Sequence, residues 1–160
     1  MGSRQPMGSS QPIQERIVMF LQQYAMGTRI FTRVVMRNSQ PVTSGPDLQG
    51  ANLSGTQLEE VVLNGANLNQ TNFSWANLRR ADLSRTNLAA GNFWHANLTQ
   101  ALLQGAKLNG AFLVGADLTE AELAGADLSG ANLKGAVLNG ANLAGAILDR
   151  TVMPDGTMQG

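Results

Sequence analysis

The chain has 160 residues, no cysteine and a formal net charge of zero. The lack of cysteine excludes disulfides, thiolate metal sites and thiol chemistry, and the length suits one domain with a short extension. No N-terminal stretch reads as a signal peptide, and no apolar run reaches the roughly 18 residues of a membrane span, so we expect a cytoplasmic protein.

The first 45 residues fall into three predicted parts. Residues 1–10 are polar, and we expect a disordered tail or a cloning scar. A helix is predicted to begin with Pro12 as its first residue and to end at Gly27 as its C-cap. Apolar residues recur there at helical spacing: Ile13, Ile17, Phe20, Leu21 and Tyr24. Residues 28–37 permit either a helix or a strand, and residues 38–45 are expected to be a linker.

This extension, residues 11–45, has two interpretations. It can cap the open end of the repeat that follows, since the ends of repeat proteins need covering. Alternatively, residues 13–37 form a basic amphipathic segment that binds a membrane surface or a partner's groove. The second interpretation rests on Arg29, Arg33 and Arg37, which lie at helical spacing beside an apolar face.

Every fifth residue from Leu48 to Leu148 is Leu or, at two positions, Phe, and Met153 continues the series. On an α-helix five residues advance about 500°, so these side chains would spiral around the axis. On a flat strand an odd spacing would place successive leucines on opposite faces. The chain must therefore turn every five residues to bring each Leu back inside. Asn or Asp before the centre and Gly two residues after it suit such turns.

The units A-N-L-S-G, A-D-L-S-R and A-D-L-T-E resemble those of the pentapeptide repeat family. The resemblance covers residues 46–155, which make 22 units of five. It implies an all-β solenoid, a right-handed quadrilateral β-helix with one unit per side and 20 residues per coil. The 22 units would then make about five and a half coils, followed by a tail over residues 156–160. The tract TVMPDGT is also similar to the tails of cyanobacterial members of the family.

A 20-residue coil assigns the outward side chains to sides of the rod. The side centred on Leu58, Leu78 and Leu98, here called the polar side, carries Glu59 and Glu60 one coil before Arg79 and Arg80. These residues are predicted to form a ladder of ion pairs between coils, and a charged patch that binds a partner is the alternative.

The side centred on Leu53, Phe73, Phe93 and Leu113 is here called the aromatic side. Its outward positions hold a group of large side chains, the aromatic cluster: Trp75, Trp94, His95, Phe112 and Val114. Exposed apolar side chains gathered on a polar rod indicate a protein-binding patch. The alternative is that the rings lie flat over the corners or are covered by the N-terminal segment. Nucleic-acid binding is disfavoured, because only Lys134 supplies positive charge on this side.

The C-terminal end also departs from the repeat. Val137, Ile147 and Val152 replace the Asn or Asp that usually precedes the centre. An uncapped edge with apolar neighbours could pair with a second copy, so the sequence is compatible with a monomer or an end-to-end homodimer.

No residues suggest catalysis, a metal site or a cofactor. His95 is the only histidine, Tyr24 is the only tyrosine, and the acidic residues are scattered over outward positions. We therefore expect a non-enzymatic scaffold that binds another protein. One alternative is a DNA mimic that modulates gyrase, as in some members of the family, but Arg79, Arg80 and Arg85 interrupt the acidic surface. The other is a membrane-associated adaptor that uses residues 13–37.

Overall fold

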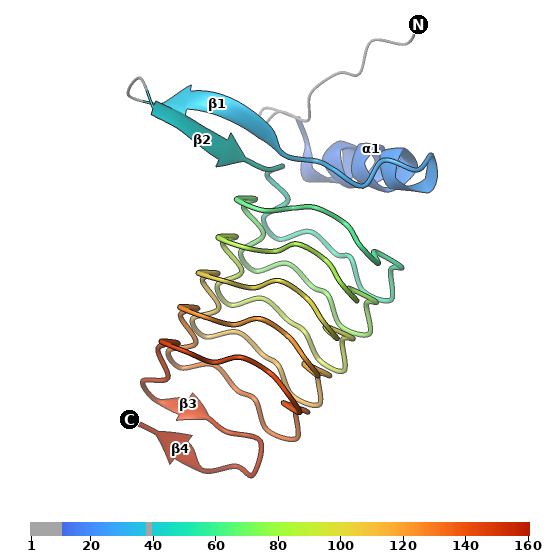
Figure 1. Cartoon of the computed structure of the whole chain (residues 1–160). Coiled ribbons are helices and arrows are strands. Elements are labelled where there is room, and N and C mark those ends of the chain that lie inside the picture. The colour runs from blue at the N-terminus through green and yellow to red at the C-terminus, as the bar shows by residue number, and fades with distance from the viewer. Residues whose placement is uncertain (1–10, 38–39) are drawn as a thin grey trace, which may run out of the picture.

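The computed structural model describes residues 11–37 and 40–160, which form a rod of stacked coils with a helix across one end (Figure 1). Five regular elements flank the coils: helix α1 (Ile13–Ala25) and strands β1 (Arg33–Arg37), β2 (Gln40–Ser44), β3 (Thr151–Val152) and β4 (Met158–Gln159). The expected tail or scar over residues 1–10 lies outside the described residues.

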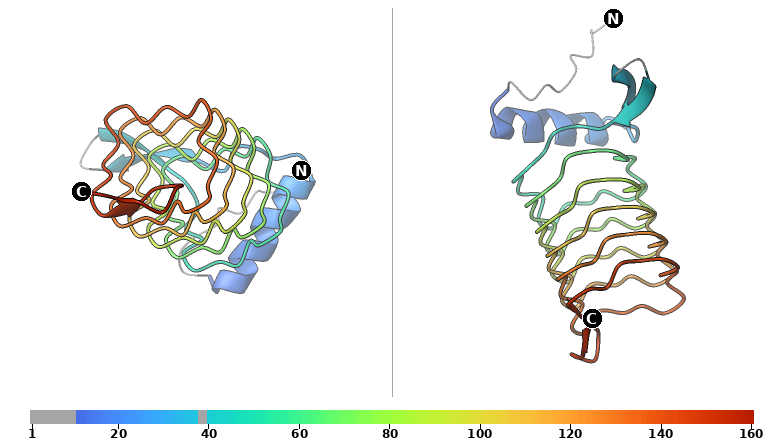
Figure 2. Two further views of the ribbon diagram at one scale, coloured as in Figure 1. Left: turned by 90° about the horizontal axis from the view of Figure 1, so that it is seen from below. Right: turned by 90° about the vertical axis from the view of Figure 1, so that its left-hand side faces the viewer.

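The coils repeat every 20 residues. Parallel bridges join residues 20 apart, from Asp47 with Asn67 to Asn132 with Val152. The backbone bonds run to both neighbouring coils: Leu98 N donates to Asp117 O at 2.7 Å, and Asn97 N donates to Ala76 O at 2.9 Å. Four five-residue units therefore make one coil, and successive coils lie one behind another when the rod is seen from below (Figure 2).

The core is a column of the repeat centres and the small residues two positions before them. Every centre from Leu48 to Leu133 is buried, and Phe73 stacks on Phe93 with ring centroids 5.3 Å apart. Leu138 and the later centres are only partly buried, because no further coil covers them in the described residues. Each inner coil thus buries its apolar face against its two neighbours.

The corners explain the polar residue types of the repeat. The side-chain oxygen of the Asn or Asp before a centre accepts the backbone N–H two residues on, as Asn97 does from Thr99 at 3.0 Å. The residue two after each centre from Leu48 to Leu148 has positive φ, and Gly often fills this position. Ten other residues adopt it as well, among them Glu60 at 60°, Trp75 at 60° and His95 at 51°. Such a conformation costs a non-glycine residue roughly 1–2 kcal/mol, so these side chains are held at some cost.

Helix α1 begins one residue later than the sequence predicts, because Pro12 has the extended conformation of an N-cap residue. The helix ends at Ala25, and Gly27 terminates it as expected with a φ of 93°. Gly27 N donates to Tyr24 O at 2.9 Å and Thr28 N donates to Gln23 O at 3.0 Å, the pair of bonds of a Schellman motif.

Helix α1 closes the N-terminal end of the rod (Figures 1 and 2). Ile17 and Phe20 are buried in the same cluster as Leu48 and Leu53, and Ile13 and Leu21 pack against it. The polar groups of the first coil are matched too. Arg16 bonds to both the carbonyl and the carboxylate of Asp47, and Tyr24 Oη donates to Glu59 O at 2.8 Å. The predicted N-terminal helix is therefore present, and it packs on the first coil.

Residues 33–37 and 40–44 form two paired strands, which shows that the second half of the ambiguous segment 28–37 is a strand and corrects the linker. Strand β1 pairs with β2 antiparallel, with Arg33 opposite Ser44 and Arg37 opposite Gln40. Its β-branched residues favour the strand. The linker prediction was wrong for residues 40–44, because they pair with β1, and its residues 38–39 lie outside the described residues. The hairpin projects from the cap, away from the coils (Figure 1).

The C-terminal residues also form more structure than the expected tail. After the last centre, Pro154, Asp155 and Gly156 turn the chain back, so that β4 pairs antiparallel with β3. Asp155 Oδ1 accepts from the backbone N–H and the hydroxyl of Thr157 at 2.9 and 2.7 Å, and Gly156 has a φ of 87°. The turn-forming sequence thus ends the repeat with a short hairpin.

Candidate functional site

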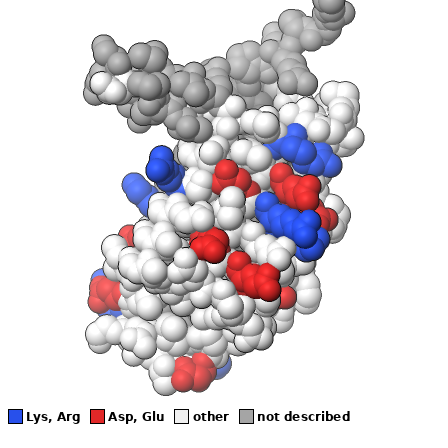
Figure 3. All heavy atoms as spheres, viewed as in Figure 1, with Lys and Arg blue, Asp and Glu red and all other residues white. Residues whose placement is uncertain are grey.

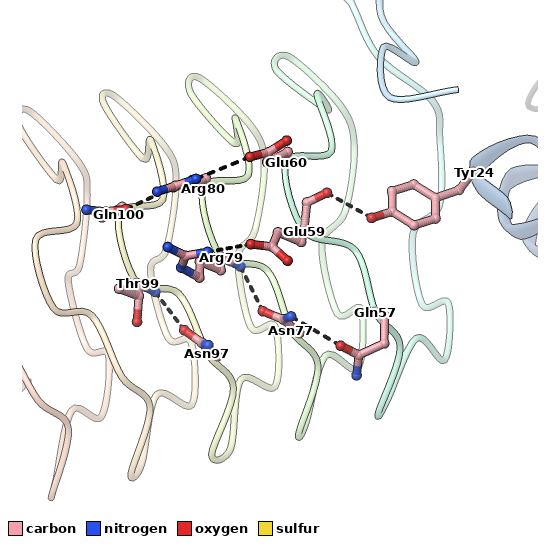
Figure 4. A network of polar contacts seen from close by, with 10 residues as sticks. All are labelled: Tyr24, Gln57, Glu59, Glu60, Asn77, Arg79, Arg80, Asn97, Thr99 and Gln100. Carbon is pink, nitrogen blue, oxygen red and sulfur yellow. Dashed lines mark hydrogen bonds and ion pairs between the residues drawn. The ribbon is translucent and has the colours of Figure 1, made fainter. Parts of the chain in front are cut away.

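The polar side consists of side chains that bond to one another from coil to coil (Figure 4). Arg79 Nη1 lies 2.6 Å from Glu59 Oε1, and Arg80 Nη1 lies 3.4 Å from Glu60 Oε1. Arg80 Nε also donates to Gln100 Oε1 at 3.0 Å, and Gln100 Nε2 donates to Glu120 Oε2 at 2.6 Å. Each arginine of the row is thus matched by a glutamate on the coil before it.

Between the cap and the polar side lies a shallow polar hollow of about 440 Å³. It is lined by Tyr24, Arg29, Gln57, Glu59, Glu60 and Asn77. The Arg29 guanidinium lies 4.0 Å from the centroid of the Tyr24 ring, and burial raises the pKa of Tyr24 above its usual value. Both glutamates are paired with arginines, and Tyr24 joins the cap to the rod here through its bond to Glu59 O.

The aromatic side is built differently, because rings in place of hydrogen-bonded polar groups contact one another between adjacent coils. The His95 ring stacks on the Trp75 ring at a centroid distance of 4.6 Å and an angle of 14°. The Trp94 ring meets both edge-on, 5.3 Å from Trp75 and 4.8 Å from His95. Edge-to-face and stacked pairs of this kind hold the rings in fixed orientations.

The rings of the aromatic cluster are open to solvent. Trp75 is 58% exposed, Trp94 46% and Phe112 55%, while Val114 is half-buried. An open hollow of about 490 Å³ lies beside them, lined by Ala90, Asn92, Trp94, Phe112 and Val114. The N-terminal helix lies across the end of the rod instead (Figure 2). None of the described residues therefore covers the cluster.

Gly115 is the residue of this site that the sequence analysis missed. A Cβ built at Gly115 would lie 2.6 Å from His95 Cε1 and 2.7 Å from His95 Nδ1, so the imidazole occupies the space that a side chain would need. A His followed 20 residues later by Gly at the same position of the repeat is a signal that could have revealed this contact. The glycine allows His95 to lie flat against the rod and to brace both indoles.

Other kinds of site are not evident in the described residues. There, no group of three or more His, Asp or Glu side chains is placed to hold a metal ion. Hydrogen bonds from Thr119 and Ser129 hold the pKa values of Asp117 and Asp127 below their usual range, which is the turn chemistry of the repeat. Within the same residues, no helix has the length and apolar content to cross a membrane.

Sequence comparison matches eight copies of the family Pentapeptide repeats, over residues 47–80, 81–119, 96–135 and 116–155. The chain therefore belongs to the pentapeptide repeat family, whose members fold as right-handed quadrilateral β-helices. No curated protein matches the chain.

Solved structures of the same class resemble the rod. The pentapeptide repeat protein Rfr23 from the cyanobacterium Cyanothece 51142 is 30% identical, with a TM-score of 0.59 over 67% of this chain and 90% of that one. One from the Arabidopsis thaliana thylakoid lumen is 33% identical, with a TM-score of 0.52 over 61% of this chain and 65% of that one. Trypsin-treated QnrB1, a plasmid-mediated fluoroquinolone resistance protein, is 20% identical, with a TM-score of 0.51 over 71% and 72%.

Proposed function

We propose that this chain is a non-enzymatic scaffold, a right-handed β-helical rod that binds another protein through the aromatic cluster. The observation that carries the proposal is the exposure of Trp75, Trp94 and Phe112 on adjacent coils of an otherwise polar rod. Such residues are typical anchors of protein interfaces, where a few aromatic side chains supply most of the binding energy.

The cluster is suited to binding because it is already ordered. The rings brace one another, and the backbone beneath them is bonded to both neighbouring coils. A partner would therefore not have to immobilise these side chains on binding, which avoids an entropy cost of about 0.5–1.5 kcal/mol for each rotamer-rich side chain.

The test compares the proteins that bind to the intact chain with those that bind to each of two variants. Trp94→Ala removes an anchor without opening the core, and we expect it to cost about 2 kcal/mol or more of binding free energy. Leu102→Ala is the matched control, because Leu102 is an exposed apolar residue on another side of the rod. A partner that both variants bind equally well would show that the cluster is not the interface.

The gyrase alternative has weaker support. At 20% identity, the likeness to QnrB1 extends to the fold alone. A DNA mimic needs a continuous acidic surface, since a duplex carries one charge per roughly 1.7 Å. Here acidic and basic side chains lie next to one another (Figure 3). We expect no effect on gyrase supercoiling at micromolar concentrations of the chain, and inhibition below that concentration would favour the DNA-mimic alternative.

The membrane-adaptor alternative is weakened by the burial of apolar residues of α1. A segment that binds a membrane surface needs its apolar side free, whereas Ile17 and Phe20 of α1 are buried against the rod. Among residues 11–32, the large apolar residues that remain well exposed are Val18, Met26 and Ile30. We expect no co-sedimentation with anionic vesicles, and strong binding would revive the alternative.

The end-to-end homodimer stays a prediction. Val137, Ile147 and Met158 are exposed at the C-terminal end of the rod, where the hairpin of β3 and β4 leaves later centres half-buried. Sedimentation equilibrium distinguishes the two states, and a dimer that Ile147→Asp dissolves would support this contact.

A further inference from the structure

The sequence Leu-Asn-Gly-Ala occurs three times in the chain, at residues 63–66, 108–111 and 138–141. A valine also precedes the first and third copies, so Asn64 and Asn139 lie within the same sequence, VLNGA. In all three copies the glycine has a similar positive φ, between 66° and 70°. The three asparagines therefore share their local sequence and the conformation of the next residue, and they differ in their place along the rod.

An asparagine that precedes glycine can lose its side-chain amide without an enzyme, which is one reason why asparagine is a thermolabile residue. The glycine nitrogen gives up its proton and attacks Cγ of the asparagine. The new N–Cγ bond closes a succinimide ring, and the amide nitrogen takes up a proton and leaves as ammonia. Water then opens the ring at either carbonyl, which gives aspartate or isoaspartate. Glycine favours the attack because it has no side chain to obstruct its nitrogen.

The first two copies lie in coils that are bonded on both sides. Gly65 N donates to Ser84 O at 3.1 Å, and Gly110 N donates to Ser129 O at 2.8 Å. The leucine of each of these copies is fully buried. A backbone N–H held in such a bond cannot lose its proton until this part of the rod opens, and burial of the neighbouring leucine makes that opening costly.

The third copy lies in the last coil, where the same groups are open. Gly140 N and Leu138 N have no backbone acceptor among the described residues. Leu138 is only partly buried, whereas its counterpart Leu63 is fully buried. Asn139 and Gly140 are both exposed. The Gly140 N–H is therefore free to lose its proton, and this part of the backbone opens at a lower cost.

We propose that Asn139 is a site of spontaneous deamidation, and that the stack of coils protects Asn64 and Asn109 from the same reaction. The Gly140 nitrogen must approach Asn139 Cγ, so the turn must change its conformation. In the last coil this change disturbs bonds to one neighbouring coil, such as that from Glu120 N to Asn139 O at 2.8 Å. In the inner coils it disturbs bonds to two. The inference does not depend on the aromatic cluster.

The reaction changes the surface at the C-terminal end of the rod. Either product adds a negative charge beside Glu120, whose Cγ lies 3.4 Å from the place of a Cβ on Gly140. Isoaspartate also lengthens the main chain, because the chain then passes through Cβ and Cγ of residue 139. Val137 and Ile147 are exposed on the same coil. Deamidation therefore places a new charge beside the apolar residues of this end.

The experiment incubates the full chain at mildly alkaline pH and measures deamidation by tandem mass spectrometry. Trypsin cleavage after Lys107 and Lys134 places the three asparagines in different peptides. We expect Asn139 to react at least about tenfold faster than Asn64 or Asn109, and to give both aspartate and isoaspartate. Incubation in guanidinium chloride is the control, where Asn64 and Asn139 should react at equal rates because their flanking sequences match.

A variant and a second measurement test the assignment and its cause. Asn139→Gln should abolish the modification of residues 135–150, which also contain Asn142. Amide hydrogen exchange followed by NMR should be faster at Gly140 than at Gly65 by about tenfold or more.

Three results would overturn the inference. The first is an equal rate at Asn64 and Asn139 in the folded chain. The second is a Gly140 N–H that is as well protected from exchange as that of Gly65. The third is aspartate at residue 139 without isoaspartate, because direct hydrolysis of the amide gives that product alone.

Discussion

The polar side and the aromatic side share one backbone but differ in the kind of contact that their outward side chains make. On the polar side Glu60, Arg80 and Gln100 bond along the rod from coil to coil. On the aromatic side the rings contact one another and otherwise face solvent. The repeat therefore fixes the core and the corners, and it leaves the outward positions free to become either a closed ladder or an open binding surface.

The largest loss of stability is expected from a substitution in the core, on which both sides depend. Leu98→Asp places an unpaired carboxylate in the buried column, and we expect a loss of more than about 4 kcal/mol of unfolding free energy. Circular dichroism during thermal unfolding measures it. Thr99→Asp is the control, because Thr99 faces outward beside Arg79 (Figure 4). A Leu98→Asp variant as stable as this control would contradict the buried column.

The packing of α1 on the first coil is expected to contribute nearly as much to the free energy of unfolding. Phe20→Ala leaves a cavity between α1 and the first coil, and we expect it to cost about 3 kcal/mol. The control Met26→Ala changes an apolar residue of the same segment that is 80% exposed, so its effect should be small. If the two variants melt at the same temperature, α1 does not stabilise the rod, and its packing is incidental.

A smaller and more specific effect separates the two sides. Gly115→Ala and Gly110→Ala both place a side chain at positive φ, which costs about 1–2 kcal/mol. Only at Gly115 does the new Cβ collide with His95, whereas the Cβ at Gly110 meets nothing within 4 Å. We therefore expect only Gly115→Ala to change the near-ultraviolet circular dichroism of the indoles. Unchanged spectra in both variants would mean that His95 does not brace them.

The smallest effect on stability is expected from the ion pairs of the polar side. A double-mutant cycle on Glu59 and Arg79 should give a coupling of about 0.2–1 kcal/mol, because both side chains are well exposed to solvent. The coupling should shrink with added salt. A coupling above about 2 kcal/mol would show that the polar side stabilises the rod more than its exposure allows.

The repeat was readable from the sequence because one side-chain requirement recurs in every unit. A single Leu in each five residues must be buried, and the Asn or Asp before it must bond to the local backbone. The ion pairs of the polar side follow once residues 20 apart are known to stack. Helix α1 was also readable, since its apolar residues recur at the spacing of one helical face.

The parts that the sequence did not reveal depend on single contacts. Strand β2 carries Pro41 and lies where a linker was expected, because its partner β1 was itself ambiguous. Strand β4 exists through one turn at Asp155 and Gly156. Gly115 looks like any other corner glycine in the sequence, and only the position of the His95 ring shows that its missing side chain matters.

The emission of Trp75 and Trp94 in the isolated chain tests most directly whether the aromatic side is open. Both indoles are about half exposed or more, so we predict fluorescence emission close to that of indole in water and ready quenching by acrylamide. Trp94→Phe and Trp75→Phe variants assign the signal to each ring. A blue, poorly quenched emission from the isolated chain would mean that the rings are already covered, and it would contradict an open binding surface.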